Sequence, residues 1–169
     1  WVDEVEKAFA GIGSGAAGSE VATRLFGYFL TWMQEKTAQV FVVTTANDIS
    51  VLPPELLRKG RFDEIFYVDF PNEAERKAIF RVHLDKRKKM NQQIDLHKLA
   101  KATDKYSGAD IESIVKEGIE RAFLANRAEL DTQRLMQVIE ATHPLGMVMK
   151  DKVKQYQNRF AEMKIKSAS

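Results

Sequence analysis

The chain has 169 residues, of which 44% are apolar and 30% are charged, so it is long enough for one large or two small domains with a core. Its formal net charge of +2 is too small to indicate nucleic-acid binding, and its lack of cysteine excludes disulfides and thiolate metal sites. The sequence has no apolar stretch of about eighteen residues that would predict a membrane span, and its histidines lie far apart.

The first residues place two carboxylates, Asp3 and Glu4, directly after the apolar pair Trp1-Val2. Adjacent carboxylates can hold a hydrated metal ion and activate a water molecule. The same two acids in the first turn of a helix would be solvated charges near the positive end of the helix dipole. From these residues alone, both interpretations stay open.

Residues 10–19 have the glycine spacing of a phosphate-binding loop, Gly13-Ser-Gly-Ala-Ala-Gly18. Such a loop continues with Lys and then Ser or Thr, whereas Ser19 and Glu20 follow here. We therefore interpret residues 10–19 as a surface loop of small residues. A phosphate-binding loop is missing from the sequence, and we expect it upstream.

Periodicity predicts the elements up to Pro71. Apolar residues at helical spacing predict a helix over 21–33, and a β-branched run over 40–44 predicts a strand buried on both faces of a parallel sheet. Proline starts a short helix predicted over 53–57, and 65–68 is a second predicted strand. Strand, helix and strand in this order predict a βαβ crossover unit in an α/β domain.

Polar residues of two kinds follow the first predicted strand. Asn47 stands at its carboxyl end, where ligands bind in open α/β sheets, although Asn before Asp48 is also typical of a turn. Arg58 and Arg61 lie close together after the predicted short helix. Guanidinium groups suit phosphate, but these two could equally be surface residues that pair with neighbouring carboxylates.

After Pro71 the sequence predicts only helices. Four of them have a residue that can cap their first turn, namely Asn72, Asp95, Ser107 and Asp131. The third is predicted to bury a face that runs from Ile111 to Phe123, and the fourth is predicted to stop before Pro144. Four short amphipathic helices with short links predict a small helical bundle.

The last twenty residues, 150–169, contain six basic and two acidic residues. Val153, Tyr156, Phe160 and Met163 recur at three- and four-residue spacing, which predicts an amphipathic helix. This helix either packs back on the bundle or offers a docking surface for a partner or an anionic surface.

Taken together, these features resemble the AAA+ ATPases over about residues 1–143. Trp1-Val2-Asp3-Glu4 resembles the end of the Walker B strand, and Asn47 stands where the family has its sensor-1 Asn. The two arginines of the second region of homology fall on Arg58 and Arg61, and Ser107-Gly108-Ala109-Asp110 resembles the sensor-2 region of the classical clade. The stretches 29–36 and 56–66 are most similar to a non-classical AAA group of cyanobacteria and some plastid genomes.

The resemblance implies a role for each of these residues. Asp3 would orient Mg²⁺, Glu4 would polarise the attacking water, and Asn47 would position that water. Arg58 and Arg61 would reach the phosphates of the neighbouring subunit in a ring, which we expect to be a hexamer. Gly108 and Ala109 would lie close to the adenine or ribose of the nucleotide.

The resemblance also implies a fold and an organisation. The fold class is α/β, the C-terminal part of a P-loop NTPase parallel sheet (βαβ) followed by an all-α lid bundle. Residues 1–71 would be the C-terminal half of the nucleotide-hydrolysing domain, cut just upstream of or within Walker B. The lid would cover 72–149, and 150–169 would be a basic amphipathic tail.

The function implied is that of a Mg²⁺-dependent ATPase that remodels or regulates a macromolecular partner, with ATP and Mg²⁺ as cofactors. The chain alone would be inactive without a phosphate-binding loop, and we expect the full protein in the cytoplasm or the plastid stroma. The alternative is a scaffold or regulatory module that uses the fold without turnover.

One departure from the family, Gln34-Glu35-Lys36 in place of Asp-Gly-Phe, puts signalling between subunits in doubt. A pore-loop aromatic would lie upstream, so the sequence gives no support for threading of a polypeptide.

Overall fold

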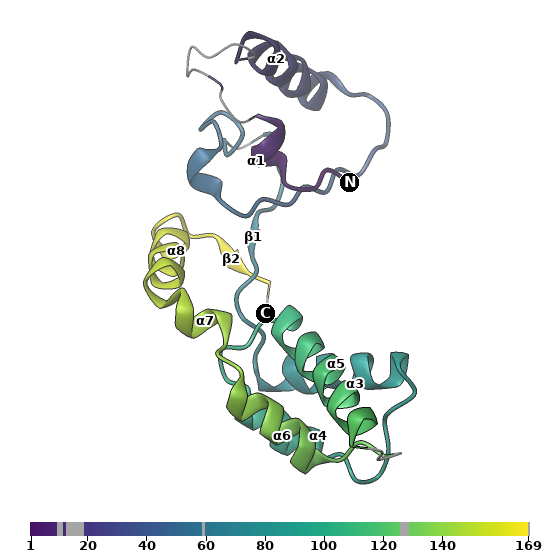
Figure 1. Cartoon of the computed structure of the whole chain (residues 1–169). Helices are drawn as coiled ribbons and strands as arrows, with labels where there is room; N and C mark the ends of the chain where they lie inside the picture. The colour runs from purple at the N-terminus through teal and green to yellow at the C-terminus, as the bar shows by residue number, and fades with distance from the viewer. Residues whose placement is uncertain (10–11, 13–18, 59, 126–128, 169) are drawn as a thin grey trace. The chain divides into compact units, whose positions relative to one another are not determined.

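The computed structural model of the chain describes residues 1–9, 12, 19–58, 60–125 and 129–168. It divides into two compact units, Trp1–Ile65 and Phe66–Ser169 (Figure 1). Each unit has its own cluster of buried apolar residues. Most of the loop predicted over residues 10–19 lies outside the described residues.

The first unit is built around the helix α2, Ser19–Glu35, which confirms the helix predicted over 21–33. The inner face of α2 buries Phe26 against Phe9, which follows the short helix α1, Val5–Ala8. The two rings meet edge to face with their centroids 5.0 Å apart. Such a ring pair stabilises by about 0.5–1.5 kcal/mol beyond the burial of its area.

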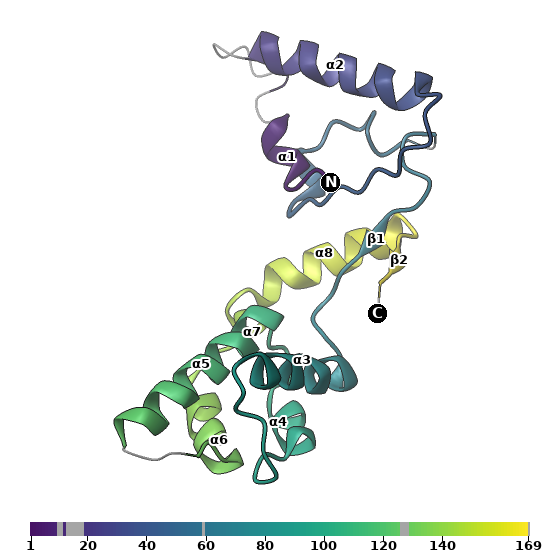
Figure 2. The ribbon, with the colours of Figure 1, turned by 90° about the vertical axis from the view of Figure 1, so that its right-hand side faces the viewer.

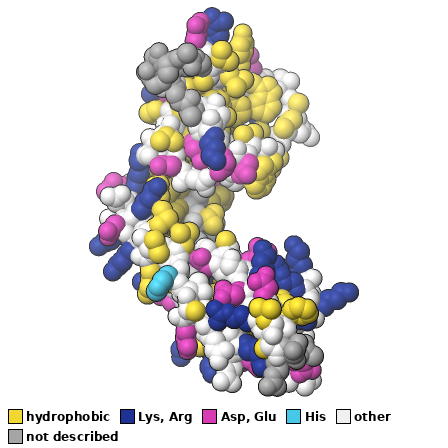
Figure 3. All heavy atoms as spheres, viewed as in Figure 1, with side chains coloured by type: hydrophobic (Ala, Val, Ile, Leu, Met, Phe, Trp, Pro, Cys, Tyr) yellow, Lys and Arg dark blue, Asp and Glu magenta, His cyan; other side chains and the backbone are white. Residues whose placement is uncertain are grey.

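The outer face of α2 is also apolar. Val21, Leu25, Tyr28 and Trp32 follow one another at helical spacing, and all four are exposed. Figure 3 shows hydrophobic side chains gathered over this helix. The helix therefore presents apolar residues on two faces, of which only one is buried within the unit.

The strand predicted over 40–44 is reduced to a single parallel bridge between Val2 and Thr44. The amide of Val2 donates to the carbonyl of Val43 at 2.9 Å, while Val40 and Phe41 are 46% and 91% exposed. The prediction of a strand buried on both faces was therefore wrong. An apolar run forms a ladder only where another strand pairs with it, and in the described part of the first unit residues 1–3 pair with this run only briefly.

The prediction of a short helix over 53–57 was also wrong, because this segment forms two successive turns. The amides of Leu56 and Leu57 donate to the carbonyls of Pro53 and Pro54 at 3.0 and 3.2 Å. A 3₁₀ helix, η1 (Ile49–Val51), precedes these turns. Pro53 and Pro54 have no backbone N–H to donate, and the described bonds of this segment span three residues, so it forms turns in place of a helix.

The second unit contains the predicted bundle of four helices. They are α3 (Glu73–Lys86), α4 (Leu96–Ala102), α5 (Gly108–Leu124) and α6 (Thr132–Ala141). Every predicted cap is present. The side chains of Asn72 and Ser107 form capping boxes with Glu75 and Asp110, and those of Asp95 and Asp131 accept bonds from the first turns of α4 and α6.

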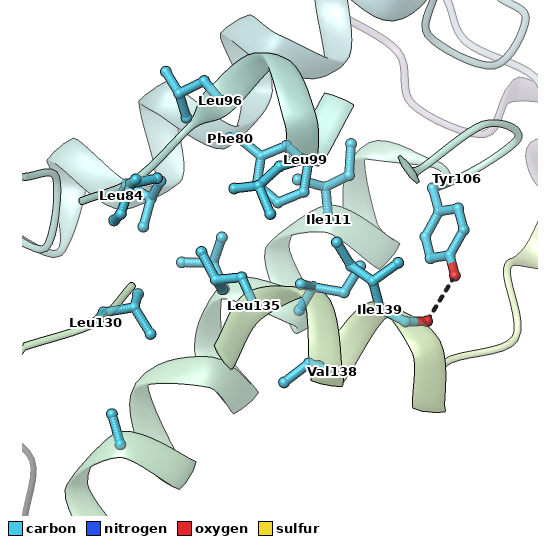
Figure 4. Packing of buried hydrophobic residues seen from close by; sticks show 14 residues of the cluster. Phe80, Leu84, Leu96, Leu99, Tyr106, Ile111, Leu130, Leu135, Val138 and Ile139 are labelled. Atoms are coloured by element: carbon cyan, nitrogen blue, oxygen red, sulfur yellow. Dashed lines mark hydrogen bonds between the residues drawn. The ribbon is translucent and has the colours of Figure 1, made fainter. Parts of the chain in front are cut away.

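The bundle encloses a core of buried apolar residues (Figure 4). Phe80, Leu84, Leu99 and Leu135, which come from three of the helices, are fully buried in it. Tyr106 lies at its edge, where its hydroxyl donates to the carbonyl of Ile139 at 3.1 Å, and burial raises the pKa of that hydroxyl.

The buried face predicted for α5 reaches only to Ala122. Phe123, expected on that face, is 79% exposed, so this part of the prediction was wrong. Phe123 lies about 100° around the helix from Ala122. Its ring is therefore directed away from the side on which Ala122 is buried.

The predicted amphipathic helix of the tail is confirmed as α8, Lys150–Glu162, which follows a short helix, α7 (Leu145–Val148). The aromatic side of α8 packs on the segment that leads into α3. The rings of Tyr67 and Phe160 stack with their centroids 4.3 Å apart, and Gln157 donates to Asp69 at 2.7 Å. The helix was expected to pack back on the bundle or to offer a docking surface; the structure packs it on residues 67–69, which lie in the same unit but before the four bundle helices.

The strand predicted over 65–68 is shortened to β1, Phe66–Tyr67, and its partner is β2, Lys166–Ser167 (Figure 2). The pairing is parallel, but it joins β1 to the tail and not to residues 40–44, so the predicted βαβ pairing was wrong. Strand partners are chosen by tertiary contacts such as that of Phe160, which the local pattern does not contain. The fold class, an α/β part followed by an all-α bundle, is confirmed, with the parallel sheet reduced to short pairings in the described residues. None of the helices in the described part of the chain combines the length and hydrophobicity needed to cross a bilayer.

Candidate functional site

Asp3 and Glu4 lie where the chain leaves its parallel bridge at Val2 and enters α1. Glu4 occupies the position before the helix with left-handed backbone angles, φ 49° and ψ 52°. A residue with a side chain in this region is strained by roughly 1–3 kcal/mol, and such strain is concentrated at functional sites. The backbone thus aims two adjacent carboxylates in different directions.

Thr45 links these two acids. Its hydroxyl donates a short hydrogen bond to Asp3 Oδ1 and accepts one from the Glu4 amide at 3.1 Å. The amide of Val5 also donates to the Thr45 carbonyl at 2.9 Å. One threonine therefore fixes the side chain of the first acid and the backbone of the second.

Asn47 contacts the second acid directly. Its side-chain amide donates to Glu4 Oε1 at 2.8 Å, and its backbone amide donates to Glu6 Oε1 at 3.1 Å. The other oxygen of Glu4 is 2.5 Å from Lys7 Nζ, and the hydrogen bond to Glu4 raises the pKa of that lysine. The structure thus brings together three of the predicted site residues, Asp3, Glu4 and Asn47.

Glu6 and Thr45 are the two residues of this cluster that the sequence analysis missed. Glu6 is only 8% exposed, and its Oε2 atom is buried without a hydrogen-bond partner. A buried carboxylate is unfavourable unless its oxygens are hydrogen bonded. Oε1 of Glu6 has its bond from Asn47, but the unpaired Oε2 costs some stability. The acidic spacing of Glu4 and Glu6 was visible in the sequence, but it does not distinguish a buried carboxylate from a solvated one.

The described residues contain no group of three or more His, Asp or Glu that could hold a metal ion by themselves. Asp3 is exposed, and its hydrogen bond from Thr45 uses Oδ1 alone. Mg²⁺ is typically held by one or two protein carboxylates and takes its remaining ligands from water and phosphate oxygens. The exposed carboxylate of Asp3 therefore fits a Mg²⁺ ion that is bound together with a phosphate compound.

The two arginines differ from each other in their surroundings. Arg58 is exposed, whereas Arg61 is half-buried. With its amide turned so that Oε1 faces the guanidinium, Gln34 at the end of α2 accepts bonds from Nη1 and Nη2 of Arg61, the latter at 2.8 Å. Within the described residues, no hydrogen bond or ion pair joins either arginine to Asp3 or Glu4.

Gly108 and Ala109 form the first turn of α5 in the second unit. A Cβ atom at Gly108 would lie 3.9 Å from Cδ1 of Ile79, which is an ordinary contact. Packing inside the unit therefore does not require glycine at this position. The predicted contact with a nucleotide would provide a separate reason for it.

Two family models match the chain. The model for the ATPase family associated with various cellular activities (AAA) matches residues 1–70, and that for the AAA+ lid domain matches residues 93–137. The two matches together cover most of the chain and fall in different units of the structure, apart from residues 66–70.

Known proteins are similar over the whole chain. It is 44% identical to the AAA domain-containing protein ycf46 of Pyropia yezoensis and 41% identical to that of Guillardia theta. It is 33% identical, over 83% of its length, to the ATP-dependent zinc metalloprotease FtsH 1 of Sphaerobacter thermophilus. The chain spans about a third of the length of the two ycf46 proteins, 34% and 33%, and 22% of that of the FtsH protein.

Proposed function

Because the chain belongs to the AAA family of ATPases, we propose that it supplies part of the site of a Mg²⁺-dependent enzyme that hydrolyses ATP. The observation that supports this most is the cluster in which Thr45 orients Asp3 while Asn47 holds Glu4. These bonds support the proposal that Asp3 is the carboxylate for a metal ion and the adjacent Glu4 the one for a water molecule. The ycf46 relatives named above are about three times as long, so the proposed activity is that of a longer protein.

Each acid has a distinct part in this proposal. Asp3 would hold the hydrated Mg²⁺, which would neutralise charge on the phosphates. Glu4 would accept a proton from the attacking water, and Asn47 would keep the Glu4 carboxylate in place. Lys7 also contacts the second oxygen of Glu4, so it would compete with the attacking water for this carboxylate.

The remaining site residues are proposed to act on other parts of the nucleotide. Arg58 is exposed and so is the better candidate to reach the phosphates of a neighbouring subunit in a ring. Arg61 would assist from a position fixed by Gln34. Gly108 and Ala109 would let the start of α5 approach the adenine or ribose, as part of a lid over 72–149.

The substitution Glu4→Gln in the full-length protein tests the proposal. The amide keeps the shape and the bond from Asn47 but lacks the carboxylate base, so ATP binding should persist while the hydrolysis rate falls by about 10²–10⁴-fold. Glu140→Gln, an exposed site on α6, is the matched control and should leave both unchanged. A Glu4→Gln protein that hydrolyses ATP at the parental rate would refute the assignment.

Subunit mixing tests the arginines. Arg58→Ala and Glu4→Gln subunits should each be nearly inactive alone, whereas mixed rings contain interfaces that join an intact Glu4 to an intact Arg58. We therefore expect ATPase activity to return in part when the two are combined. Mixed rings, verified by mass, that stay inactive would show that Arg58 acts within its own subunit or only in folding.

A scaffold without turnover is the second candidate, and one observation favours it. Both oxygens of Glu4 already accept a bond, one from Asn47 and one from Lys7, so the carboxylate has fewer lone pairs left for a water molecule. In that case the full-length protein should bind ATP without hydrolysing it, and Lys7→Gln should not create activity.

The proposed partner is an unidentified macromolecule, which Glu4→Gln protein held in its ATP state should retain in a pull-down. The cytoplasm or the plastid stroma is the proposed location, which a fluorescent fusion would test.

A further inference from the structure

The second unit holds a groove of about 450 Å³ between the start of α3, the turn before α5, and α8. Four of the residues that line it are basic and two are acidic. The basic residues are Arg76, Lys105, Lys150 and Lys154, and the acidic residues are Asp69 and Asp104. The lining therefore carries an excess of positive charge, although the whole chain has a formal net charge of only +2.

Arg76 is the unusual member of this set, because its side chain is only 8% exposed. Its Nε donates to the carbonyl of Ala100 at 3.0 Å, and Nη1 donates to that of Pro71 at 2.7 Å. Within the described residues, Nη2 has no hydrogen-bond acceptor. The guanidinium is therefore fixed in position by Nε and Nη1, while Nη2, which is not among the buried atoms that lack a partner, is open to solvent.

The charge of Arg76 is also poorly neutralised. Its ion-pair partner is Asp104, whose carboxylate is 4.0 Å away and 74% exposed. A buried charge is costly unless a counter-charge lies close to it, and a water-exposed carboxylate at this distance compensates for little of that cost. An anion in the groove would supply the missing counter-charge.

The lysines of α8 contribute charge from the opposite wall. Lys150 and Lys154 are one turn apart, so they stand on the same side of the helix, where like charges repel. Figure 3 shows Lys and Arg side chains gathered over α8. The acid on this side, Asp69, is already occupied by Gln157 and by the amide of Phe70.

The wall that carries Lys105 is closely packed. A Cβ atom at Gly146 of α7 would lie 2.5 Å from the carbonyl oxygen of Lys105 and 3.1 Å from Cζ of Phe70. Glycine thus allows α7 to lie directly against the turn at Lys105 and against the segment before α3. This contact holds the backbone at Lys105 close to α7, which leads into α8.

We propose that this groove binds a small anion that carries a phosphate or pyrophosphate group. The planar guanidinium of Arg76 matches the spacing of two phosphate oxygens, and the lysines add charge without directional demands. The volume of the groove lies in the range of small-ligand sites. None of its residues belongs to the proposed ATP site, so this second site stands independently of the proposed function.

Titration of the chain itself with inorganic pyrophosphate, at constant ionic strength, tests the proposal. We expect saturable binding by calorimetry and amide chemical-shift changes confined to the groove, at Lys105, Gly146 and Lys150. Lys150→Gln/Lys154→Gln should weaken binding at least tenfold. The control Lys98→Gln/Lys101→Gln, which removes the same charge from exposed sites on α4, should bind like the parent chain.

Arg76→Lys provides a second variant, because it keeps the charge but loses the planar fork. It should weaken pyrophosphate binding at least tenfold if the circular dichroism spectrum is that of the parent chain. Arg76 also bonds two backbone carbonyls, so Arg76→Lys can fail to fold. In that event the binding measured with Lys150→Gln/Lys154→Gln tests the proposal.

Several results would overturn the proposal. These are the absence of saturable binding, equal weakening by both lysine pairs, and citrate binding as tightly as pyrophosphate. A titration with inorganic phosphate distinguishes the free ion from a larger compound that carries the phosphate group. Tighter binding of phosphate than of pyrophosphate would assign the groove to the free ion. Tighter binding of pyrophosphate would assign it to a larger phosphate compound. None of these results depends on ATP hydrolysis, which is measured separately in the full-length protein.

Discussion

The two units of the chain bury apolar surface to different extents. Among the residues that the structure describes, the core of the second unit joins fourteen buried residues, most of them from its four bundle helices, whereas that of the first joins five. The first unit also leaves the outer face of α2 exposed, from Val21 to Trp32. Since buried apolar area is the main source of stability, we expect the second unit to be the more stable one.

The chain offers separate probes for the two units. Its two tryptophans, Trp1 and Trp32, both belong to the first unit, so tryptophan fluorescence, excited where tyrosine does not absorb, reports on that unit alone. Far-ultraviolet circular dichroism is dominated by the helices of the second unit. Unfolding in urea should therefore give a fluorescence transition at lower denaturant than the dichroism transition.

The largest expected effect comes from Phe80→Ala in the core of the second unit. Phe80 is fully buried, and the cavity should lower the free energy of unfolding by about 3–5 kcal/mol. The dichroism midpoint should shift, and the fluorescence midpoint should not. The control Val82→Ala, at a site 61% exposed on the same helix, should change stability by less than about 0.5 kcal/mol. Equal shifts of both midpoints would mean that the units unfold together.

The next largest effect is expected from replacing one glycine in each unit by alanine, which should change the free energy of unfolding in opposite directions. A Cβ atom at Gly118 of α5 would lie 2.7 Å from Cδ2 of the fully buried Leu135, so Gly118→Ala should destabilise the second unit by about 1–3 kcal/mol. Gly27 of α2 has no atom within 4 Å of such a Cβ, so Gly27→Ala should stabilise the first unit by up to about 1 kcal/mol. Urea midpoints that move in the same direction for both would contradict the packing described above.

A smaller effect is expected at the helix cap that begins the second unit's bundle. Asn72→Ala removes the bond to the amide of Glu75 at 3.0 Å and should cost about 1 kcal/mol by dichroism. Asn158→Ala, at an exposed site within α8, is the control and should cost less than about 0.5 kcal/mol. A cap variant as stable as the control would show that tertiary packing alone fixes the start of α3.

The smallest effect concerns pH. The hydrogen bond from Arg87, with a second from Lys116, lowers the pKa of Glu112 from 4.5 to about 2. Because this pKa is lowered by folding, the stabilisation is complete above pH 4.5 and is lost as the pH falls from there towards 2. The effect is small because the Glu112 side chain is 33% exposed and water screens the ion pairs.

Glu112→Gln should therefore lower the dichroism midpoint at pH 7 and make it less dependent on pH between about 4.5 and 3. Glu140→Gln, which removes an exposed carboxylate from α6, should retain the pH dependence of the parent chain. A Glu112→Gln chain whose midpoint falls with acid as steeply as the parent would assign that dependence to other groups.

The sequence alone predicted the four bundle helices and the tail helix of the second unit because their signals are local, whereas the short α7 was not predicted. The bonds at Asn72 and Ser107 join residues three positions apart, so the capping pattern can be read directly. The roles of the predicted site residues stay predictions that the experiments above address, and the division of the chain at residues 71 and 149 also stays a prediction.

The acidic pair and Asn47 could be picked out in the sequence because carboxylate and amide side chains directly after apolar, strand-like runs are typical of ligand sites at sheet edges. Their contacts could not be foreseen, since Thr45 and Glu4 are 41 residues apart in the chain. The same holds for Gln34 beside Arg61 and for the buried position of Glu6.

Local pattern thus determined the helices, their caps and the chemical types at the candidate site. Tertiary structure decided which segments meet: the single bridge at Val2, the pairing of β1 with the tail, and the groove around Arg76. The physical reason is that a helix satisfies its backbone within a few residues, whereas a strand or a buried charge depends on partners that only the folded chain brings near.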